Sequence, residues 1–281
     1  MLEDYAIYRT VIEQVLREEE QLPSLPTITM KIRTALNQPS TTNKQLAQLI
    51  KADPSLTAIL LKYACSPLYR TRVSPKSLTE VIAHLGWETV DRIVMSHSIK
   101  SLFIMQSPQL KKLFNIAWER QKLKSAISYV IAKQLQYRPL EEVLIASLIS
   151  DLGTLAVLSA FKSRKEVPSE TTYYTLCKEY SKSLGIVLLK KWSVSDHYIE
   201  AVRYSGQWQE DTGETLKLID LINLGLFSAI RIHSPKAELP LINTITAFRK
   251  LPAKLAVASN NNELELVNQH KPDIGLAMQS F

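Results

Sequence analysis

Apolar residues recur at helical spacing along most of this chain, in short stripes separated by capping residues and prolines. Within residues 43–64 they recur every three or four positions, at Leu46, Leu49, Ile50, Leu56, Ile59, Leu60 and Tyr63. This spacing places the apolar side chains on one face of each helix. The pattern therefore predicts short amphipathic helices that pack on a shared core.

The starts of several helices are marked by residues that cap a helical N-terminus. A hydroxyl stands three residues before Gln or Glu in Thr42–Gln45 and in Ser77–Glu80, which is the spacing of a capping box. Asp53–Pro54 combines a side-chain acceptor with a proline at the first helical position. Pro26 and Pro139 are interpreted in the same way. Helices are predicted to begin near residues 26, 43, 54, 78 and 139.

The rest of the chain continues the helical pattern. A leading amphipathic helix is predicted over residues 5–16, and two prolines in the connector 22–26 prevent a helix there. Further helices are predicted over residues 110–135, around Asp151, and over 171–181, 183–192, 196–204 and 216–232. We divide the chain into a leading helix (1–21), an N-terminal helical lobe (22–107), a second helical lobe (108–232) and a C-terminal helical extension (233–281).

The stretch 143–161 is long and apolar enough to approach a membrane span. Asp151 is its one charged residue, and Gly153 and three serines dilute its apolar content. A carboxylate at mid-membrane costs about 2.5 to 3.5 kcal/mol on insertion scales. We therefore interpret this stretch as a buried central helix and expect no membrane insertion.

Composition narrows the fold class. Hydrophobic residues make up 46% of the 281 residues and charged residues 22%, as in folded globular chains. Only 7 glycines occur, and this scarcity favours an all-α fold over turn-rich β architectures. The two glycines nearest in sequence are Gly206 and Gly213, so the chain contains neither a G-x-G-x-x-G turn nor a Walker A loop.

The charge of the chain is moderately basic. The 34 basic and 27 acidic side chains give a formal net charge of +7, which is not gathered into a dense block. A nucleic-acid site would need basic residues on one face with stacking aromatics; the candidates are Lys111, Lys112, Lys122, Lys124, Lys190 and Lys191.

Cys65 and Cys177 are far apart in sequence, and together with the acidic start of the chain they predict a cytoplasmic location without disulfides.

Three sequence blocks in the first half carry a resemblance to a known family. Residues 22–26 read LPSLP, residues 46–57 read LAQLIKADPSLT, and residues 78–86 read LTEVIAHLG. A looser set follows at Trp118, residues 147–153 (SLISDLG), Gly185, Leu188, Leu189, Trp192, Ile219 and Asp220. In this order they resemble the HDOD family, a bacterial signalling output domain related to the HD metal-dependent phosphohydrolases. The resemblance implies a multi-helical fold with an N-terminal lobe and an HD-like lobe.

The related HD enzymes hold metal ions through histidines, a His-Asp pair and a late aspartate. The resemblance places those positions on Arg120, Ser150, Asp151, Ser181, Tyr204, Ser205 and Asp220. Only the two aspartates keep a metal-binding side chain, and an arginine at a ligand position repels a cation. The five histidines, at 84, 97, 197, 233 and 270, form no His-Asp dipeptide and no H-E-x-x-H pair. The resemblance therefore implies a degenerate site with no metal ligands, no catalytic residues and no cofactor.

We therefore expect a non-catalytic bacterial signal-transduction module, not an enzyme, that binds a protein partner in a regulatory pathway. One alternative is a divergent metal-dependent phosphohydrolase for a nucleotide or cyclic dinucleotide, which requires Asp151 and Asp220 to converge on a metal. Another is a nucleic-acid or nucleotide binding protein, which we disfavour. We also expect Arg120 to replace the lost metal by pairing with Asp151, with Asp220 close by.

Overall fold

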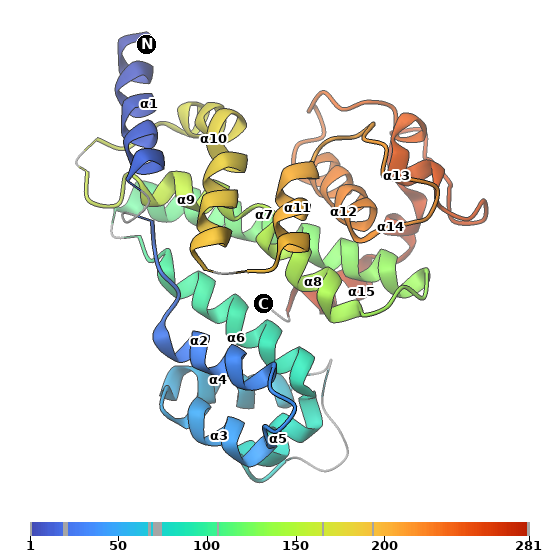
Figure 1. Ribbon diagram of the computed structural model, residues 1–281. Helices are drawn as coiled ribbons and strands as arrows, with labels where there is room; N and C mark the ends of the chain where they lie inside the picture. The colour runs from blue at the N-terminus through green and yellow to red at the C-terminus, as the bar shows by residue number, and fades with distance from the viewer. Residues whose placement is uncertain are drawn as a thin grey trace. The chain divides into compact units, whose positions relative to one another are not determined.

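The computed structural model describes residues 2–18, 22–66, 69, 75–105, 107–164, 166–192 and 194–279. These residues contain fifteen α-helices, one short 3-10 helix and one isolated β-bridge between Ala258 and Leu264, and they contain no β-strand (Figure 1). The predicted all-α fold is confirmed.

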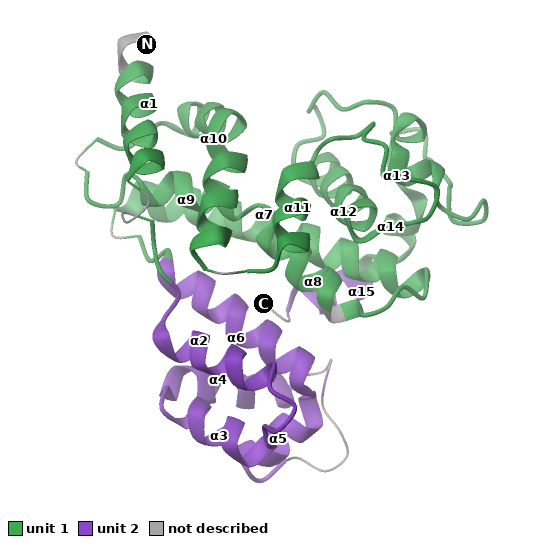
Figure 2. Ribbon diagram, viewed as in Figure 1, with its two compact units in different colours: residues 1–24, 103–271 green, residues 25–102, 272–281 purple. Residues whose placement is uncertain are grey.

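The chain forms two compact units (Figure 2). Unit 1 comprises residues 1–24 and 103–271, and unit 2 comprises residues 25–102 and 272–281. The leading helix and most of the C-terminal extension therefore belong to the same compact unit as the second helical lobe.

Unit 2 is a cluster of short helices around one apolar core. Its helices are α2 (Thr27–Leu36), α3 (Asn43–Lys51), α4 (Pro54–Ala64), α5 (Leu78–Leu85) and α6 (Trp87–Leu102), and it also holds most of α15 (Lys271–Met278). The stripe residues Leu46, Ile50, Leu56 and Leu60 are buried in this core, as their spacing predicts.

The caps form largely as predicted, with one difference. Thr42 and Gln45 complete a capping box at α3, and Asp53 accepts hydrogen bonds from the backbone of the first turn of α4. Ser77 accepts from the Glu80 backbone, but the Glu80 carboxylate accepts from Lys76 N instead of Ser77 N. Only one half of the predicted box forms there, because the carboxylate reaches one residue further back.

Unit 1 is built around its longest helix. The helices of this unit are α1 (Leu2–Arg17), α7 (Pro108–Gln134), α8 (Leu140–Ile149), α9 (Leu152–Ser159), α10 (Glu170–Lys191), α11 (Asp196–Tyr204), α12 (Leu218–His233), η2 (Ile242–Thr244), α13 (Thr246–Arg249) and α14 (Glu265–Gln269). α7 packs against α8, α9 and α12, while α10 packs against α9, α11 and α1 (Figure 1).

Two predicted helix boundaries in unit 1 are wrong. The segments 171–181 and 183–192 form one continuous helix, α10, because no residue between them interrupts the backbone hydrogen bonds. The central apolar stretch is two helices, since α8 ends at Ile149 and α9 begins at Leu152. The interruption falls on Ser150 and Asp151.

The apolar stretch lies in the core of unit 1. By length and composition, Glu142–Ser159 qualifies as a membrane span, yet 83% of it is buried inside the protein. Residues covered by other helices have no face left for lipid, so this stretch serves as packing surface for α7 and α10.

Two glycines allow helices of unit 1 to approach closely. A Cβ at Gly153 on α9 would lie 1.6 Å from the carbonyl oxygen of Ser181 on α10. A Cβ at Gly225 on α12 would lie 2.0 Å from Ser128 Oγ on α7. Only glycine fits such contacts without moving a backbone or a buried side chain. Gly153 thereby sets the position of Ser181 beside the start of α9.

Gly153→Ala should therefore destabilise the protein by about 3 kcal/mol or more, because overpacking against a backbone carbonyl cannot be relieved by a side-chain rotation. The matched control is Gly275→Ala on α15, where the added Cβ meets no atom of the described chain within 4 Å. That control should stabilise by about 0.5–1 kcal/mol, as expected for Gly→Ala in an open helix. Denaturant unfolding measures both, and equal effects would contradict the close approach of α9 and α10.

Candidate functional site

Five of the seven site positions predicted from the sequence meet at one cavity of about 530 Å³ in unit 1, which we call the unit 1 cavity. These five are Arg120, Ser150, Asp151, Ser181 and Ser205. They come from α7, the junction between α8 and α9, α10 and the residue after α11. The packing of unit 1 thus brings together residues that are up to 85 positions apart in the sequence.

Asp151 is held by an ion pair with a buried lysine. Lys124 Nζ on α7 lies 2.9 Å from Asp151 Oδ2, with the lysine side chain fully buried and the aspartate side chain 16% exposed. The same ammonium donates a hydrogen bond of 2.7 Å to Ser150 Oγ, which in turn donates to Ser147 O. Lys124 therefore contacts both residues at the break between α8 and α9.

A second polar residue of α7 supports the same break. Gln121 is fully buried, and its Nε2 donates to Asp151 O at 3.0 Å and to Thr154 Oγ1 at 3.1 Å. Asp151 O also accepts from Thr154 N at 3.0 Å and from Thr154 Oγ1 at 2.8 Å, so Gln121 adds a third donor to this carbonyl. Gln121 and Lys124 therefore contact the backbone and the side chain of Asp151 from one face of α7.

Arg120 does not take the role expected for it. Among the described residues its guanidinium forms no ion pair within 4 Å, and its buried Nε has no hydrogen-bond partner. The expected Arg120–Asp151 pair is replaced by Lys124–Asp151, because Lys124 lies one helical turn further along α7 and faces the α8–α9 junction. Arg120 lines the unit 1 cavity instead, close enough for its charge to act on Asp151.

The charges around Asp151 set its protonation. Burial disfavours the charged carboxylate, but the neighbouring Lys124 and Arg120 outweigh burial and hold the pKa of Asp151 below its usual value. Burial lowers the pKa of Lys124, and the Asp151 carboxylate opposes this effect.

Burial raises the pKa of the Cys177 thiol to about 12. Cys177 lines the same cavity, but a thiol with this pKa is not a nucleophile at neutral pH.

The remaining two predicted positions lie elsewhere in unit 1. Tyr204 lines a different cavity of about 280 Å³, beside the contact of His197 Nε2 with Glu142 Oε1 at 2.8 Å. Asp220 is buried at the start of α12, where it accepts from Lys217 N and Thr212 Oγ1 and forms an ion pair of 2.9 Å with Lys250. Asp151 and Asp220 therefore hold separate partners and do not line a common cavity.

The donor set around the unit 1 cavity does not fit a divalent cation. Asp151 is the one carboxylate among the described lining residues, and an ammonium already contacts it. The other positions there that the family resemblance assigns to ligands carry a guanidinium and three hydroxyls, and a guanidinium has no lone pair to donate. Cys177 and His233 also line the cavity, but together with Asp151 they form no group suited to a metal ion. No group of three or more His, Cys, Asp or Glu side chains suited to a metal occurs among the described residues.

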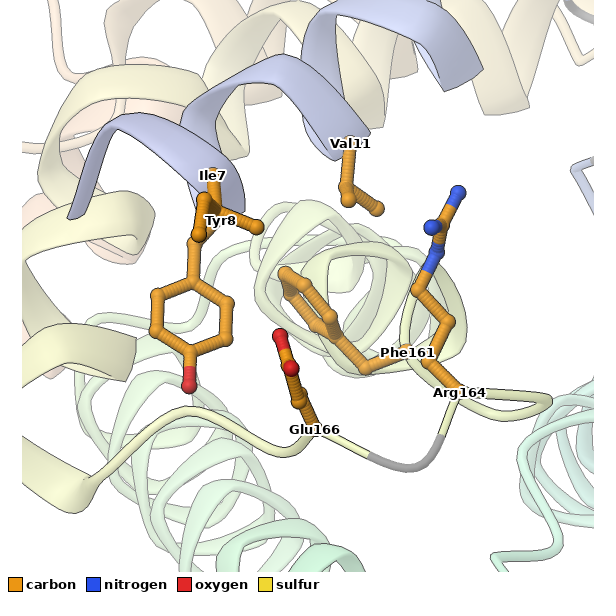
Figure 3. Close-up of a pocket in the computed structure, with 6 residues that line it drawn as sticks. All are labelled: Ile7, Tyr8, Val11, Phe161, Arg164 and Glu166. Atoms are coloured by element: carbon orange, nitrogen blue, oxygen red, sulfur yellow. The ribbon is translucent and has the colours of Figure 1, made fainter. Parts of the chain in front are cut away.

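A further cavity of about 380 Å³ lies under α1 (Figure 3). Tyr8 and Val11 point from α1 toward Phe161, and the rings of Tyr8 and Phe161 meet edge to face at 5.5 Å. Arg164 and Glu166 line the opposite side with opposite charges. This cavity gathers no titratable cluster and is a gap in the packing of α1.

Sequence reasoning missed Lys124 and Gln121 as members of the site. The buried face of α7 includes Leu113, Ala117, Gln121, Lys124 and Ser128, a spacing of three and four. Extending the apolar stripe of α7 would have placed both polar residues inside. A lysine on an otherwise apolar stripe signals a buried partner of opposite charge.

The six basic residues considered for nucleic acid do not form one free face. Lys124 is buried in its ion pair, Lys122 contacts Glu119, and Lys191 donates to Leu22 O. Lys111, Lys112 and Lys190 are exposed. At least half of the set is therefore committed to contacts within the protein.

Comparison with known proteins identifies a family for this chain. A family model described as the HDOD domain matches residues 22–208. No curated protein matches the chain.

Solved structures share the fold at low sequence identity. A protein from Shewanella amazonensis SB2B, provisionally called a metal-dependent phosphohydrolase, is 18% identical, with a TM-score of 0.75 over 100% of this chain and 99% of its own. An HDOD domain protein of unknown function from Geobacter sulfurreducens is 18% identical, with a TM-score of 0.67 and 97% coverage of both chains. A protein from Marinobacter aquaeolei VT8, provisionally called a signal transduction protein, is 15% identical, with a TM-score of 0.60 over 99% of this chain and 66% of its own.

Lys124→Met should lower the free energy of unfolding by about 3–5 kcal/mol at neutral pH, because it leaves the Asp151 carboxylate without its ammonium partner. The double variant Lys124→Met/Asp151→Asn removes both charges and should recover most of this loss. The matched control is Lys122→Met, whose pair with the exposed Glu119 carboxylate contributes less than about 1 kcal/mol. Denaturant unfolding distinguishes the three. A double variant no more stable than Lys124→Met would contradict the pairing.

The ion pair of Lys124 with Asp151 also predicts that the free energy of unfolding depends on pH. Because the pKa of Asp151 is lowered in the folded protein, its ionisation contributes stability above the ordinary carboxyl pKa of about 4, and this contribution is lost as the pH falls through the lowered value. Lys124→Met lacks this contribution. The stability difference between wild type and Lys124→Met should therefore narrow as the pH is lowered from about 7 to about 3. A constant difference would show that Asp151 is not the partner that matters.

Proposed function

The chain belongs to the HDOD domain family, and we propose that it is a non-catalytic signal-transduction module of a bacterial cytoplasm that binds a protein partner. The observation that carries the proposal is the contact of Lys124 with Asp151, which puts an ammonium beside the one carboxylate of the unit 1 cavity. A scaffold that keeps its packing while its ligand chemistry is replaced is suited to binding and regulation.

The first alternative is a metal-dependent phosphohydrolase, as the Shewanella protein is provisionally called. It requires Asp151 and Asp220 to converge on a metal ion. Asp220 instead pairs with Lys250, and Asp151 pairs with Lys124, so each carboxylate already has a cationic partner. These contacts favour the non-catalytic function.

The second alternative is a nucleic-acid binding protein. It requires several free lysines on one face beside stacking aromatics. Lys122, Lys124 and Lys191 already have partners within the protein, which weakens this alternative. The favoured partner is therefore another protein.

Hydrolysis assays test the non-catalytic part of the proposal. Protein purified without chelator and incubated with Mn²⁺ or Mg²⁺ should release no phosphate above background from phosphomonoesters, nucleotides or cyclic dinucleotides, since no cluster of ligands among the described residues could hold the ion. Metal analysis of the same sample should give well below one equivalent. The control is Asp151→Asn, which should behave as wild type. Turnover that Asp151→Asn abolishes would overturn the proposal.

Partner binding is tested separately in the native cell. The tagged full chain and the tagged double variant Lys124→Met/Asp151→Asn should capture the same protein, because the interaction does not depend on metal chemistry. Cross-linking and mass spectrometry identify the captured protein. A tag-only sample is the control for background. Capture of no protein above that background would leave the signalling role without a partner and would contradict it.

A further inference from the structure

The unit 1 cavity has the size and the walls of a small-molecule site. Its volume of about 530 Å³ lies within the roughly 300–1,000 Å³ typical of ligand pockets. All of its lining residues belong to unit 1, so its shape does not depend on unit 2. The cavity is therefore a feature of unit 1 by itself.

Positive charge dominates the wall of this cavity. Arg120, Lys178 and Lys182 line it, and Asp151 is the one carboxylate among the described lining residues. The charge of Asp151 is already balanced by Lys124, which lies behind the wall. The charges of Arg120 and Lys182 also act on the Asp151 carboxylate, so the described lining holds three cationic side chains and His233 against one carboxylate.

Three buried polar atoms at the cavity have no hydrogen-bond partner among the described residues, and one of them, Asp151 Oδ2, keeps its ion-pair contact with Lys124. Arg120 Nε and Ser205 Oγ are buried, and neither has a hydrogen-bond partner in the described structure. A buried donor without a partner costs about 1–3 kcal/mol, and more when the group is charged. Proteins retain such groups where a ligand satisfies them. An anion in the cavity would accept from both.

The cavity also has apolar lining residues. Val202, Leu226 and Ile230 line it, and Tyr174 adds an aromatic ring. A bare inorganic ion would leave these side chains facing empty space. The walls together favour a ligand with an anionic end and a compact apolar or aromatic body.

We propose that the unit 1 cavity binds a small organic dianion, with its oxyanion group against Arg120 and Lys182 and its apolar body against Val202 and Leu226. A doubly charged group matches the surplus of positive charge better than a single carboxylate does. Lys182 lines the cavity at an exposed position, and its amino group also donates to Arg203 O at 3.2 Å. The bound ligand is held without being cleaved.

This inference rests on the proposed absence of metal chemistry. Binding of the anion is measured in EDTA and turnover is measured with Mn²⁺, so either proposal can fail without the other. The probes for titration calorimetry are phenyl phosphate and phthalate as dianions, benzoate as a monoanion, benzamide as a neutral analogue and inorganic phosphate as an anion without an apolar body. At about pH 8 the two dianions should bind at least tenfold more tightly than benzoate or inorganic phosphate, and benzamide should not bind.

Variants locate the binding site. Arg120→Met should weaken binding of the dianions about tenfold or more, as expected for the loss of a charge-assisted hydrogen bond. It should keep or raise the melting temperature of the free protein, because it removes an unsatisfied buried group. Lys112→Met, exposed on the same helix and outside the cavity, is the matched control and should leave affinity unchanged. If Arg120→Met does not fold, Lys182→Met, at an exposed position, provides the same test with an expected loss of several fold.

The outcomes separate the two proposals. Failure of every dianion to bind wild type at millimolar concentration, or equal binding by wild type and both cavity variants, would overturn the inference and leave the non-catalytic proposal intact. Binding in EDTA followed by phosphate release from phenyl phosphate with Mn²⁺ would support the site but overturn the non-catalytic proposal. Binding without release supports both.

Discussion

The contact between Lys124 and Asp151 is the interaction on which the organisation of unit 1 depends. It lies at the break between α8 and α9, where the chain changes direction inside an apolar core. A charge in such a core is tolerated only when a partner of opposite sign and hydrogen bonds accompany it. Lys124 provides the charge, and Gln121 provides the hydrogen bond to the backbone. α7 is thereby tied to the junction that forms one wall of the cavity.

Close helix packing completes the arrangement. Gly153 follows the break directly and lets α9 approach the backbone of α10, while Gly225 lets α12 approach α7. A second buried pair, Asp220 with Lys250, ties the start of α12 to the C-terminal extension. The two surviving aspartates thus serve two different structural connections. Because each carboxylate has its own cationic partner, the two do not meet at one site in this structure.

The chemistry of the unit 1 cavity follows from the charges that line it. Cationic side chains repel a metal cation and attract an anion, and a low local dielectric strengthens that attraction. Arg120 lines the cavity with a buried Nε that has no hydrogen-bond partner among the described residues.

The sequence by itself determined the helical class, most helix starts and the family, because capping residues, apolar spacing and motif order are local properties of the chain. The capping box of Thr42 with Gln45 and the cap of Asp53 act within a few residues, so they can be identified without the fold. The sequence also identified Arg120, Asp151 and Ser181 as neighbours through the family pattern. Only the tertiary structure decided that Lys124 and not Arg120 pairs with Asp151. It also decided that Asp220 pairs with Lys250 and that the predicted central helix is interrupted at Ser150. These choices depend on which long side chain reaches a buried carboxylate, and that is set by the packing of helices distant in sequence.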